Sequence, residues 1–293
     1  MTSNSQAHHP FLLPEHELLR TTVRRFIKER VQPLAPSWEE SGFVPRDLLR
    51  EMGDLGLLGL RYPSAYGGSE LDTLATVVLA EELGRSTFGG FAITVLVHTD
   101  MASPHLFHAG TEAQKARYLP DLIAGRKIAA VAMTEADAGS DLAGMRTTAR
   151  LEGNEWVLNG GKMYITNGVH GDVFFVAAKT GNLDIGQKRG RHISMFVVEK
   201  GWPGFSVSAP LKKQGWLSSD TAELHFDSCR LPFENLLGER DQGFYALMKN
   251  LQNERIVLGA QAMGEASKAI EMTLEWLTQR QAFGSSLWDK QAI

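Results

Sequence analysis

The sequence predicts a multidomain protein of α and β structure, in which two helical regions flank a central region of β-strands. Up to Gly125, apolar residues recur three and four positions apart, as they do between Pro14 and Val31. After Gly125 the segments become short, rich in valine, isoleucine, phenylalanine and threonine, and separated by turn residues. From Asp241 the helical spacing returns, and we expect it to hold to about Phe283. The order is therefore helices, strands, and helices again.

The N-terminal helical domain is expected to span residues 1–126. Its predicted helices are PEHELLRTTVRRFIKERV, RDLLREMGDLGLLGL, LDTLATVVLAEELGRS, FAITVLVHTDMASPHLFHAG and TEAQKARYLPDLIAG. Pro14 suits a first helical turn, because an N–H at that position would have no partner within the helix. The glycine pair in YPSAYGGSELD indicates the loop between the second and third of these helices.

The middle domain, residues 127–238, is expected to form an antiparallel β-barrel or sandwich. The predicted strands are KIAAVAMT, WVLNGGKMYIT, VFFVAAKT, ISMFVVEK, FSVSAP and AELHFDSCRL, with turns at LEGNEW and KTGNLDIGQKRGRH. Residues 239–293 are predicted to begin a C-terminal helical domain. Since a lone amphipathic helix cannot bury its apolar stripe, we expect this helix to pack on the first domain, on another copy, or on further chain.

Composition and charge narrow the functional classes. Of 293 residues, 43% are hydrophobic and 22% charged, which is typical of a soluble globular protein. A formal net charge of −4 argues against a nucleic-acid partner and against a polybasic membrane surface. The single cysteine, Cys229, excludes an internal disulfide and fits a reducing compartment. With no signal or transit peptide in MTSNSQAHHPFLLPEHE, we expect a cytoplasmic protein, and no metal site is predicted.

One residue in the stretch NLQNERIVLG is unexpected. Wound as a helix, Leu247, Leu251, Glu254 and Leu258 share one stripe, which is expected to be buried. No basic residue lies three or four positions from Glu254, so no helical ion pair is available to it. Such a setting should raise the pKa of Glu254 above the ordinary value of about 4.3. The structural alternative is a glutamate whose side chain bends to a helix end or to water.

Two loops carry candidate binding residues. In AVAMTEADAGSDLAG, the hydroxyls of Thr134 and Ser140 and the amides around Gly139 could donate to a phosphorylated ligand, although the same loop also reads as a plain solvated turn. In KMYITNG, alternation places Tyr164 and Thr166 on one face of a strand, where they could stack on and bond a planar ring system. The alternative is a tyrosine packed on the core. Neither a P-loop nor a dinucleotide-binding glycine motif occurs.

Taken together, TEADAGSD, KMYITNG, SSDTAELHFDSCRLPFENLLGERDQGF, NERIVLGAQAMG and RQAFG resemble the acyl-CoA dehydrogenase family in order and spacing. VHTDMASPHL and LSSDTAEL look most similar to its citronellyl-CoA dehydrogenase branch. The resemblance implies the acyl-CoA dehydrogenase fold, with a helical domain, a β-barrel domain and a C-terminal helical bundle. It also implies FAD as the cofactor, bound between the barrel and the C-terminal helices.

The resemblance assigns roles to individual positions. Matching positions place the FAD-binding residues at Met133, Thr134, Gly139, Ser140, Tyr164, Thr166, Arg280 and Phe283. Thr134 and Thr166 would bond the flavin ring, and Tyr164, where most members have tryptophan, would stack on it. Ser140 would contact the pyrophosphate.

The resemblance also implies the reaction. Glu254 stands where isovaleryl- and long-chain-type members carry the base that removes the α-proton of an acyl-CoA, while the β-hydrogen leaves as hydride to flavin N5. The product would be the trans-2-enoyl-CoA, and electron-transfer flavoprotein would be the electron acceptor. Ser140, Leu251 and Arg255 match substrate contacts, and a branched or medium acyl chain is expected.

Arg280 and Phe283 match an RxxFG motif whose arginine meets the FAD of a neighbouring subunit, which implies a homo-oligomer, either a dimer or a tetramer. An unbroken helix would separate Glu254 from Arg280 by about 39 Å, too far for one compact site. The alternative is an arginine favoured by the dipole at a helix end.

Rival interpretations stay open. The same fold hosts flavin monooxygenases and oxidases, and the chain could also be a truncated module that binds without catalysis. Members of the family continue beyond RQAFGSSLWDKQAI, so the chain is expected to lack much of the C-terminal domain. Weak FAD retention and poor turnover are the corresponding expectations for this polypeptide.

Overall fold

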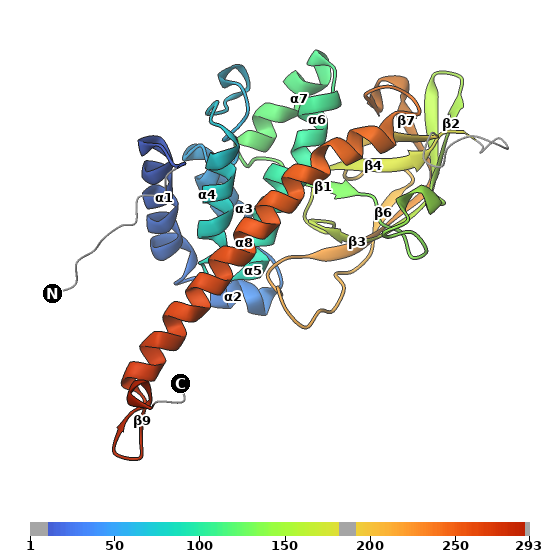
Figure 1. Ribbon diagram of the computed structural model, residues 1–293. Coiled ribbons are helices and arrows are strands. Elements are labelled where there is room, and N and C mark those ends of the chain that lie inside the picture. Colours follow the sequence, from blue (N-terminus) through green and yellow to red (C-terminus); the bar gives the residue numbers. More distant parts are fainter. Residues whose placement is uncertain (1–10, 182–191, 291–293) are drawn as a thin grey trace.

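The computed structural model describes residues 11–181 and 192–290. Figure 1 shows the N-terminal helices on one side of the molecule, the strands on the other, and the long helix α8 (Gly243–Gln279) running from the strands across the helices. The predicted order of helices, strands and helices is confirmed. No helix in the described part of the chain is long and apolar enough to span a membrane.

The N-terminal region contains more breaks than the sequence predicts. Its elements are α1 (Pro14–Phe26), the π-helix η1 (Ile27–Val31), α2 (Ala35–Ser41), α3 (Arg46–Asp54), η2 (Ser64–Tyr66), α4 (Thr73–Gly84), α5 (Gly89–Leu96), the π-helix η3 (Val97–Ala102), α6 (Ser103–Ala109) and α7 (Glu112–Ile123). The predicted second helix ends at Asp54, because Gly56 takes a left-handed φ of 73° that a helix cannot continue through. Helix α2 was not predicted, and the predicted fourth helix is divided by η3.

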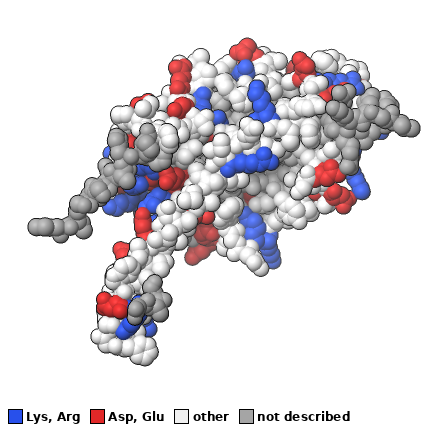
Figure 2. All heavy atoms as spheres, viewed as in Figure 1, with Lys and Arg blue, Asp and Glu red and all other residues white. Residues whose placement is uncertain are grey.

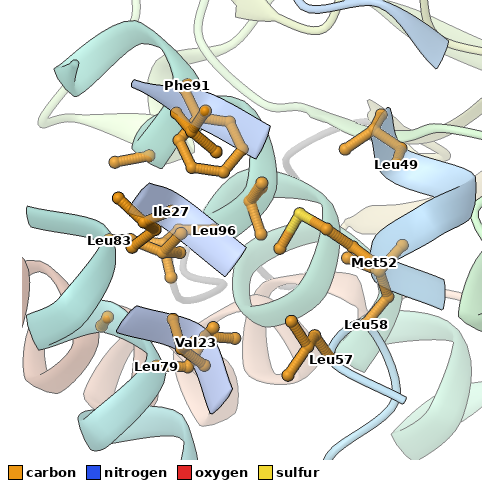
Figure 3. Packing of buried hydrophobic residues seen from close by; sticks show 14 of the residues in the cluster. Val23, Ile27, Leu49, Met52, Leu57, Leu58, Leu79, Leu83, Phe91 and Leu96 are labelled. Atoms are coloured by element: carbon orange, nitrogen blue, oxygen red, sulfur yellow. The ribbon is translucent and has the colours of Figure 1, made fainter. Parts of the chain in front are cut away.

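One apolar core joins α1, η1, α2, α3, α4, α5 and η3, whereas α6 and α7 belong to a second core that they share with strands. Figure 3 shows Val23 and Ile27 facing Leu79 and Leu83 of α4, with Phe91 and Leu96 of α5 alongside. The spacing that predicts each helix also selects these core positions, and each such side chain contributes about 1.5–3 kcal/mol on full burial. The core holds α4, α5 and η3 together, and α8 packs against α4 and η3.

The strands form one eight-stranded mixed sheet. They are β1 (Ala129–Ala132), β2 (Thr148–Glu152), β3 (Glu155–Thr166), β4 (Val173–Lys179), β5 (Ile193–Glu199), β6 (Phe205–Val207), β7 (Thr221–Pro232) and β8 (Leu236–Leu237). Their order is β6-β7-β3-β2-β4-β5-β8, and β1 pairs with β4. Strand β2 was not predicted, because its last residues, Leu151 and Glu152, were placed in the turn LEGNEW, which the structure limits to Gly153 and Asn154. Of the predicted turn KTGNLDIGQKRGRH, residues 182–191 lie outside the described residues.

The prediction of purely antiparallel pairing is wrong in two places. Strand β4 pairs parallel with both β1 and β2, whereas the other strand pairs of this sheet are antiparallel. The physical reason lies in the connection, since β1 reaches β4 through the β2–β3 hairpin, and such a crossover allows the parallel pairing that a tight turn forbids.

The last helix ends earlier than expected. Helix α8 stops at Gln279 instead of Phe283, and a small hairpin of β9 (Gln281–Ala282) and β10 (Ser285–Ser286) follows. Phe283 and Gly284 connect its strands with φ values of 50° and 79°, and positive values at both positions favour a two-residue hairpin turn.

The predicted apolar stripe of α8 is only partly right. Leu247 and Glu254 are buried, but Leu251 is half-buried and Leu258 is 39% exposed. The buried face instead contains Leu247, Asn250, Glu254, Val257, Gln261 and Gly264. These positions alternate three and four apart, as in a helix that packs along one seam, so the face is more polar than the sequence suggests.

Candidate active site

Glu254 is a buried carboxylate on the packed face of α8. It is 8% exposed, and Asn250, one turn earlier, donates from Nδ2 to its Oε1 at 2.9 Å. Burial raises the pKa of Glu254, although the Asn250 bond and the charge of Arg255 oppose the rise. The predicted burial and raised pKa are therefore confirmed, and the alternative in which the side chain bends to water is wrong. A carboxylate in such a setting is suited to act as a general base near neutral pH.

The π-helix η3 holds Asn250, the residue whose amide donates to Glu254. The backbone oxygen of Asp100 accepts from Asn250 Nδ2 at 2.9 Å and from Asn253 Nδ2 at 3.3 Å. A π-helical turn shifts the pattern of backbone hydrogen bonds, which is one reason that such turns are frequent at functional sites. The buried Asp100 carboxylate in turn contacts Arg61 Nη2 at 3.4 Å. Helix α8 is thus anchored to η3 directly beside Glu254.

A histidine also lies close to the carboxylate. His105 of α6 is 2% exposed, and its Nε2 lies 3.9 Å from Glu254 Oε1 without a hydrogen-bond partner. Burial, helped by the nearby His108, lowers the pKa of His105 to about 4. The imidazole is therefore neutral at physiological pH.

A second set of candidate residues lies where β1 and β3 end. The Met163 amide donates to the Thr134 oxygen at 2.9 Å, which brings the residues after β1 beside the end of β3. Below them, the buried Lys162 donates from Nζ to the Met133 oxygen at 3.1 Å and to Glu135 Oε1 at 2.7 Å. The structure therefore brings Met133 and Thr134 next to the KMYITNG segment, as expected if they serve one ligand.

Glu135 holds the loop that carries Gly139 and Ser140. Besides the Lys162 ammonium, its carboxylate accepts from the amides of Arg146 at 2.5 Å and Thr147 at 3.1 Å. Burial opposes ionisation of this carboxyl, but Lys162 and the amides outweigh it and hold its pKa below the usual range. Gly139 and Ser140 are exposed between these anchored ends, so their backbone is open to a ligand.

Tyr164 is presented to solvent by a local irregularity in β3. The pairing with β7 shifts between Lys162 and Ile165, and Tyr164 has a φ of 60°. Its side chain is 63% exposed, whereas Thr166 is half-buried. Regular alternation is therefore broken here, and the alternative of a tyrosine packed on the core is wrong. Strained backbone of this kind gathers at ligand sites, where the surrounding structure compensates for it.

The π-helix η3 connects both sets of residues. His98 accepts from the Ala129 amide of β1 through Nδ1 at 3.0 Å, while Asp100 meets Asn250 of α8. The start of β1 and the Glu254 carboxylate therefore flank the same turn of chain. His98 is a structural residue, because its Nε2 is also bonded, to the Leu122 oxygen at 2.9 Å.

Comparisons with known proteins identify the family. Residues 13–126, 130–229 and 241–293 match models of the N-terminal, middle and C-terminal domains of acyl-CoA dehydrogenases. The chain belongs to the acyl-CoA dehydrogenase family. This bears out the resemblance read from the motifs, whereas the likeness to the citronellyl-CoA branch stays a prediction.

Among relatives, the chain is 39% identical to long-chain specific acyl-CoA dehydrogenase of Rattus norvegicus and 40% identical to isovaleryl-CoA dehydrogenase of Pongo abelii. The matches cover 95% and 94% of this chain but only 64% and 65% of those proteins.

Among solved structures, acyl-CoA dehydrogenase of Geobacillus kaustophilus matches with a TM-score of 0.92 and 38% identity, over 97% of this chain and 73% of that one. An acyl-CoA dehydrogenase of Bacillus anthracis complexed with FAD matches with a TM-score of 0.89 and 39% identity, over 96% of this chain and 47% of that one. The acyl-CoA dehydrogenase fold is therefore shown.

In this member of the family, the remaining predicted residues lie in two places. Leu251 and the exposed Arg255 lie on α8 beside Glu254. Arg280 follows the end of α8, and Phe283 is 98% exposed at the hairpin turn. The helix is unbroken between Glu254 and Gln279, which places Arg280 about 39 Å from Glu254. Arg280 and Phe283 are therefore not brought together with the other predicted residues.

Sequence reasoning missed several parts of the site. Asn250 stands four residues before Glu254, a spacing at which helical side chains meet, so it could have been found. His105, Asp100 and Arg61 come from distant parts of the chain and carry no local signal. Within residues 11–181 and 192–290, no cluster of three histidine, cysteine or acidic side chains is placed to bind a metal ion.

Proposed function

We propose that this chain carries the catalytic base and part of the cofactor site of an FAD-dependent acyl-CoA dehydrogenase, which converts an acyl-CoA thioester to the trans-2-enoyl-CoA. The observation that carries the proposal is Glu254, a buried carboxylate with a raised pKa, bonded by Asn250 and facing no lysine or arginine within ion-pair distance among the described residues. The named activities of the long-chain and isovaleryl relatives support the class of substrate.

The residues at the ends of β1 and β3 fit FAD. Tyr164 offers an exposed aromatic ring, which suits a planar ring system. Thr166 lies two residues further along β3, and Thr134 is bonded through its backbone oxygen to Met163, so both hydroxyl-bearing residues belong to the same part of the chain surface as Tyr164. Gly139 is open, since a Cβ there would meet nothing within 4 Å, and Ser140 beside it is exposed. We assign these residues, with Met133, to FAD, as the FAD complex of the Bacillus anthracis relative supports. When bound, FAD would supply the acceptor for the β-hydrogen and its electron pair.

Glu254 would take the α-proton of the substrate on a carboxylate oxygen. Its burial disfavours the charged form, so the carboxylate is a stronger base than an exposed glutamate. Asn250 donates to Oε1 and fixes the orientation of the group, because its own amide is held by the Asp100 oxygen. We assign the exposed guanidinium of Arg255 to the phosphates of CoA, and Leu251 and Ser140 to substrate contacts.

Three wider assignments belong to the same proposal. Arg280 and Phe283 would serve the FAD of a neighbouring copy in a homo-oligomer, since they lie far from Glu254 along α8. Electron-transfer flavoprotein would accept the electrons. Location in the cytoplasm stays a prediction.

The visible absorption spectrum tests the proposal. The purified chain with saturating FAD should show flavin absorption that bleaches when an acyl-CoA is added without oxygen. Glu254→Gln keeps an oxygen that can accept from Asn250 but removes the base, so bleaching should slow by about 10²- to 10⁴-fold. Equal bleaching rates in both proteins would overturn the assignment of Glu254.

The rival functions give other results in the same experiment. A non-catalytic binding module would bind acyl-CoA equally well in both proteins without bleaching. An oxidase or monooxygenase would form peroxide rapidly in air without an electron-transfer flavoprotein.

A further inference from the structure

The imidazole of His105 is a buried polar group next to Glu254 that the proposed mechanism does not use. Its Nε2 has no hydrogen-bond partner and is shielded from solvent. A buried nitrogen in this condition destabilises the folded state, because it has lost its hydrogen bonds to water and has gained none in exchange. We therefore expect a neighbouring group to accept a hydrogen bond from Nε2 in some state of the protein.

Glu254 is placed to be that partner. Its Oε1 lies 3.9 Å from Nε2, about 1 Å beyond hydrogen-bond distance. A small rotation of the glutamate side chain would close this gap, because the described residues hold the Glu254 carboxylate by a single hydrogen bond, from Asn250. The other buried histidine of this region, His98, has both ring nitrogens bonded and needs no such partner.

We propose that His105 is a positioning residue for Glu254, whose neutral imidazole donates from Nε2 to the carboxylate as a second donor beside Asn250. Its catalytic significance rests on the proposed function, since only a base needs this control. Because burial keeps His105 uncharged, it contributes a directed N–H and not a counter-charge. The bond would favour the ionised form of the carboxylate. It would also fix the orientation of the second oxygen, Oε2, which is left to accept the proton of the substrate.

Few charged groups lie near His105 and Glu254 in the described part of the chain. Arg255 on α8 acts on Glu254 through its charge, and the exposed His108 on α6 lies near His105. Asp100 of η3 is paired with Arg61, which offsets its charge. A change confined to position 105 therefore alters the donor at Nε2 and leaves these charges in place.

Carbon NMR of the chain with ¹³C-labelled glutamate carboxyls measures the effect directly through the pKa of Glu254. His105→Leu removes the donor and should raise the Glu254 pKa by about half a unit or more. His105→Gln, whose amide nitrogen can occupy the Nε2 position, should leave it within about 0.3 units of the unaltered protein. His108→Gln is the matched control on the same helix and should also leave it unchanged.

Two results would overturn the inference. One is a Glu254 pKa that does not change in His105→Leu, and the other is a His105→Gln protein that behaves like His105→Leu. Should the leucine variant fail to fold, His105→Asn replaces it, because its shorter amide cannot reach the Nε2 position and should raise the pKa likewise. The titration needs neither FAD nor acyl-CoA, so its failure and the failure of the proposed function are distinguishable.

Discussion

At the scale of single residues, the setting of Glu254 decides its chemistry. The sequence predicts a glutamate on a buried helix face, because helical spacing is local information. It does not predict the anchor of Asn250 at Asp100 or the nearby His105, since these two contacts join segments about 150 residues apart. The burial of the Lys162 ammonium could not be predicted either, because the sequence around it is that of an ordinary strand.

The raised pKa of Glu254 predicts a pH-dependent cost to stability. Below the unfolded-state pKa of about 4.3 the carboxyl is protonated in both states and costs nothing. As the pH rises through the folded-state pKa, the folded state resists ionisation and loses stability relative to the unfolded chain. Glu254→Gln should therefore melt higher than the unaltered protein at neutral pH, by about 2 °C or more, and equally near pH 4. Calorimetry at both pH values checks this, and a glutamine variant that melts lower at neutral pH would contradict it.

The Glu135–Lys162 pair makes a second prediction at this scale. Glu135→Leu leaves the Lys162 ammonium buried without its carboxylate and should cost about 3–5 kcal/mol of unfolding free energy. Adding Lys162→Met removes the stranded charge, so the double variant should be more stable than the single one. Urea denaturation of both variants measures the difference. If the double variant loses more than the single one, the pair is not coupled as the structure indicates.

At the scale of secondary-structure elements, the contact between α4 and α8 positions the candidate base. A Cβ on Gly264 would lie 2.0 Å from the Glu81 oxygen, and one on Gly84 would lie 2.2 Å from the Gln261 oxygen. The backbones of α4 and α8 therefore touch, and α8 packs on η3 as well. Sequence reasoning treats a glycine inside a helix as a weak point, so this contact could not be predicted from it. The helices themselves were predictable because their apolar spacing is regular.

Two glycines of α8 form a matched test of that contact. Gly264→Ala must push α8 away from α4 and should destabilise the protein by about 1–3 kcal/mol. Gly259→Ala on the same helix meets nothing within 4 Å, and there the better helix propensity of alanine should stabilise by up to about 1 kcal/mol. Denaturation midpoints of the two variants should thus move in opposite directions. Equal midpoints would show that the helices do not approach as closely as described.

At the scale of the whole molecule, α8 extends beyond the body that its first half packs against (Figure 1). Figure 2 shows mostly uncharged surface on the visible face of this protruding part. Its large apolar side chains are exposed, among them Ile270 at 61%, Met272 at 51% and Trp276 at 60%. The expectation that this helix packs on the first domain is confirmed for its first half, whereas its packing on another copy or on further chain stays a prediction. The order of the domains could be predicted from the sequence, because it depends on local apolar spacing. What covers the second half of α8 could not, because it depends on contacts with distant residues or with another molecule.

The proposed homo-oligomer predicts how this helix behaves in hydrogen exchange. Amides of residues 243–264 are protected by packing within the chain, so their exchange should not depend on protein concentration. Amides of residues 265–279 belong to a helix whose apolar side chains are largely exposed, and alone it should open easily. If a second copy covers these side chains, protection of residues 265–279 should increase as the concentration is raised.

Ile270→Glu with Trp276→Glu supplies the control, because charges on the apolar face should abolish the concentration dependence while leaving residues 243–264 unchanged. Protection of residues 265–279 that is the same at every concentration would count against self-association through α8. Residues 280–283 would then lie outside any interface built on this helix, and their assignment to the cofactor site of a neighbouring copy would fail with it.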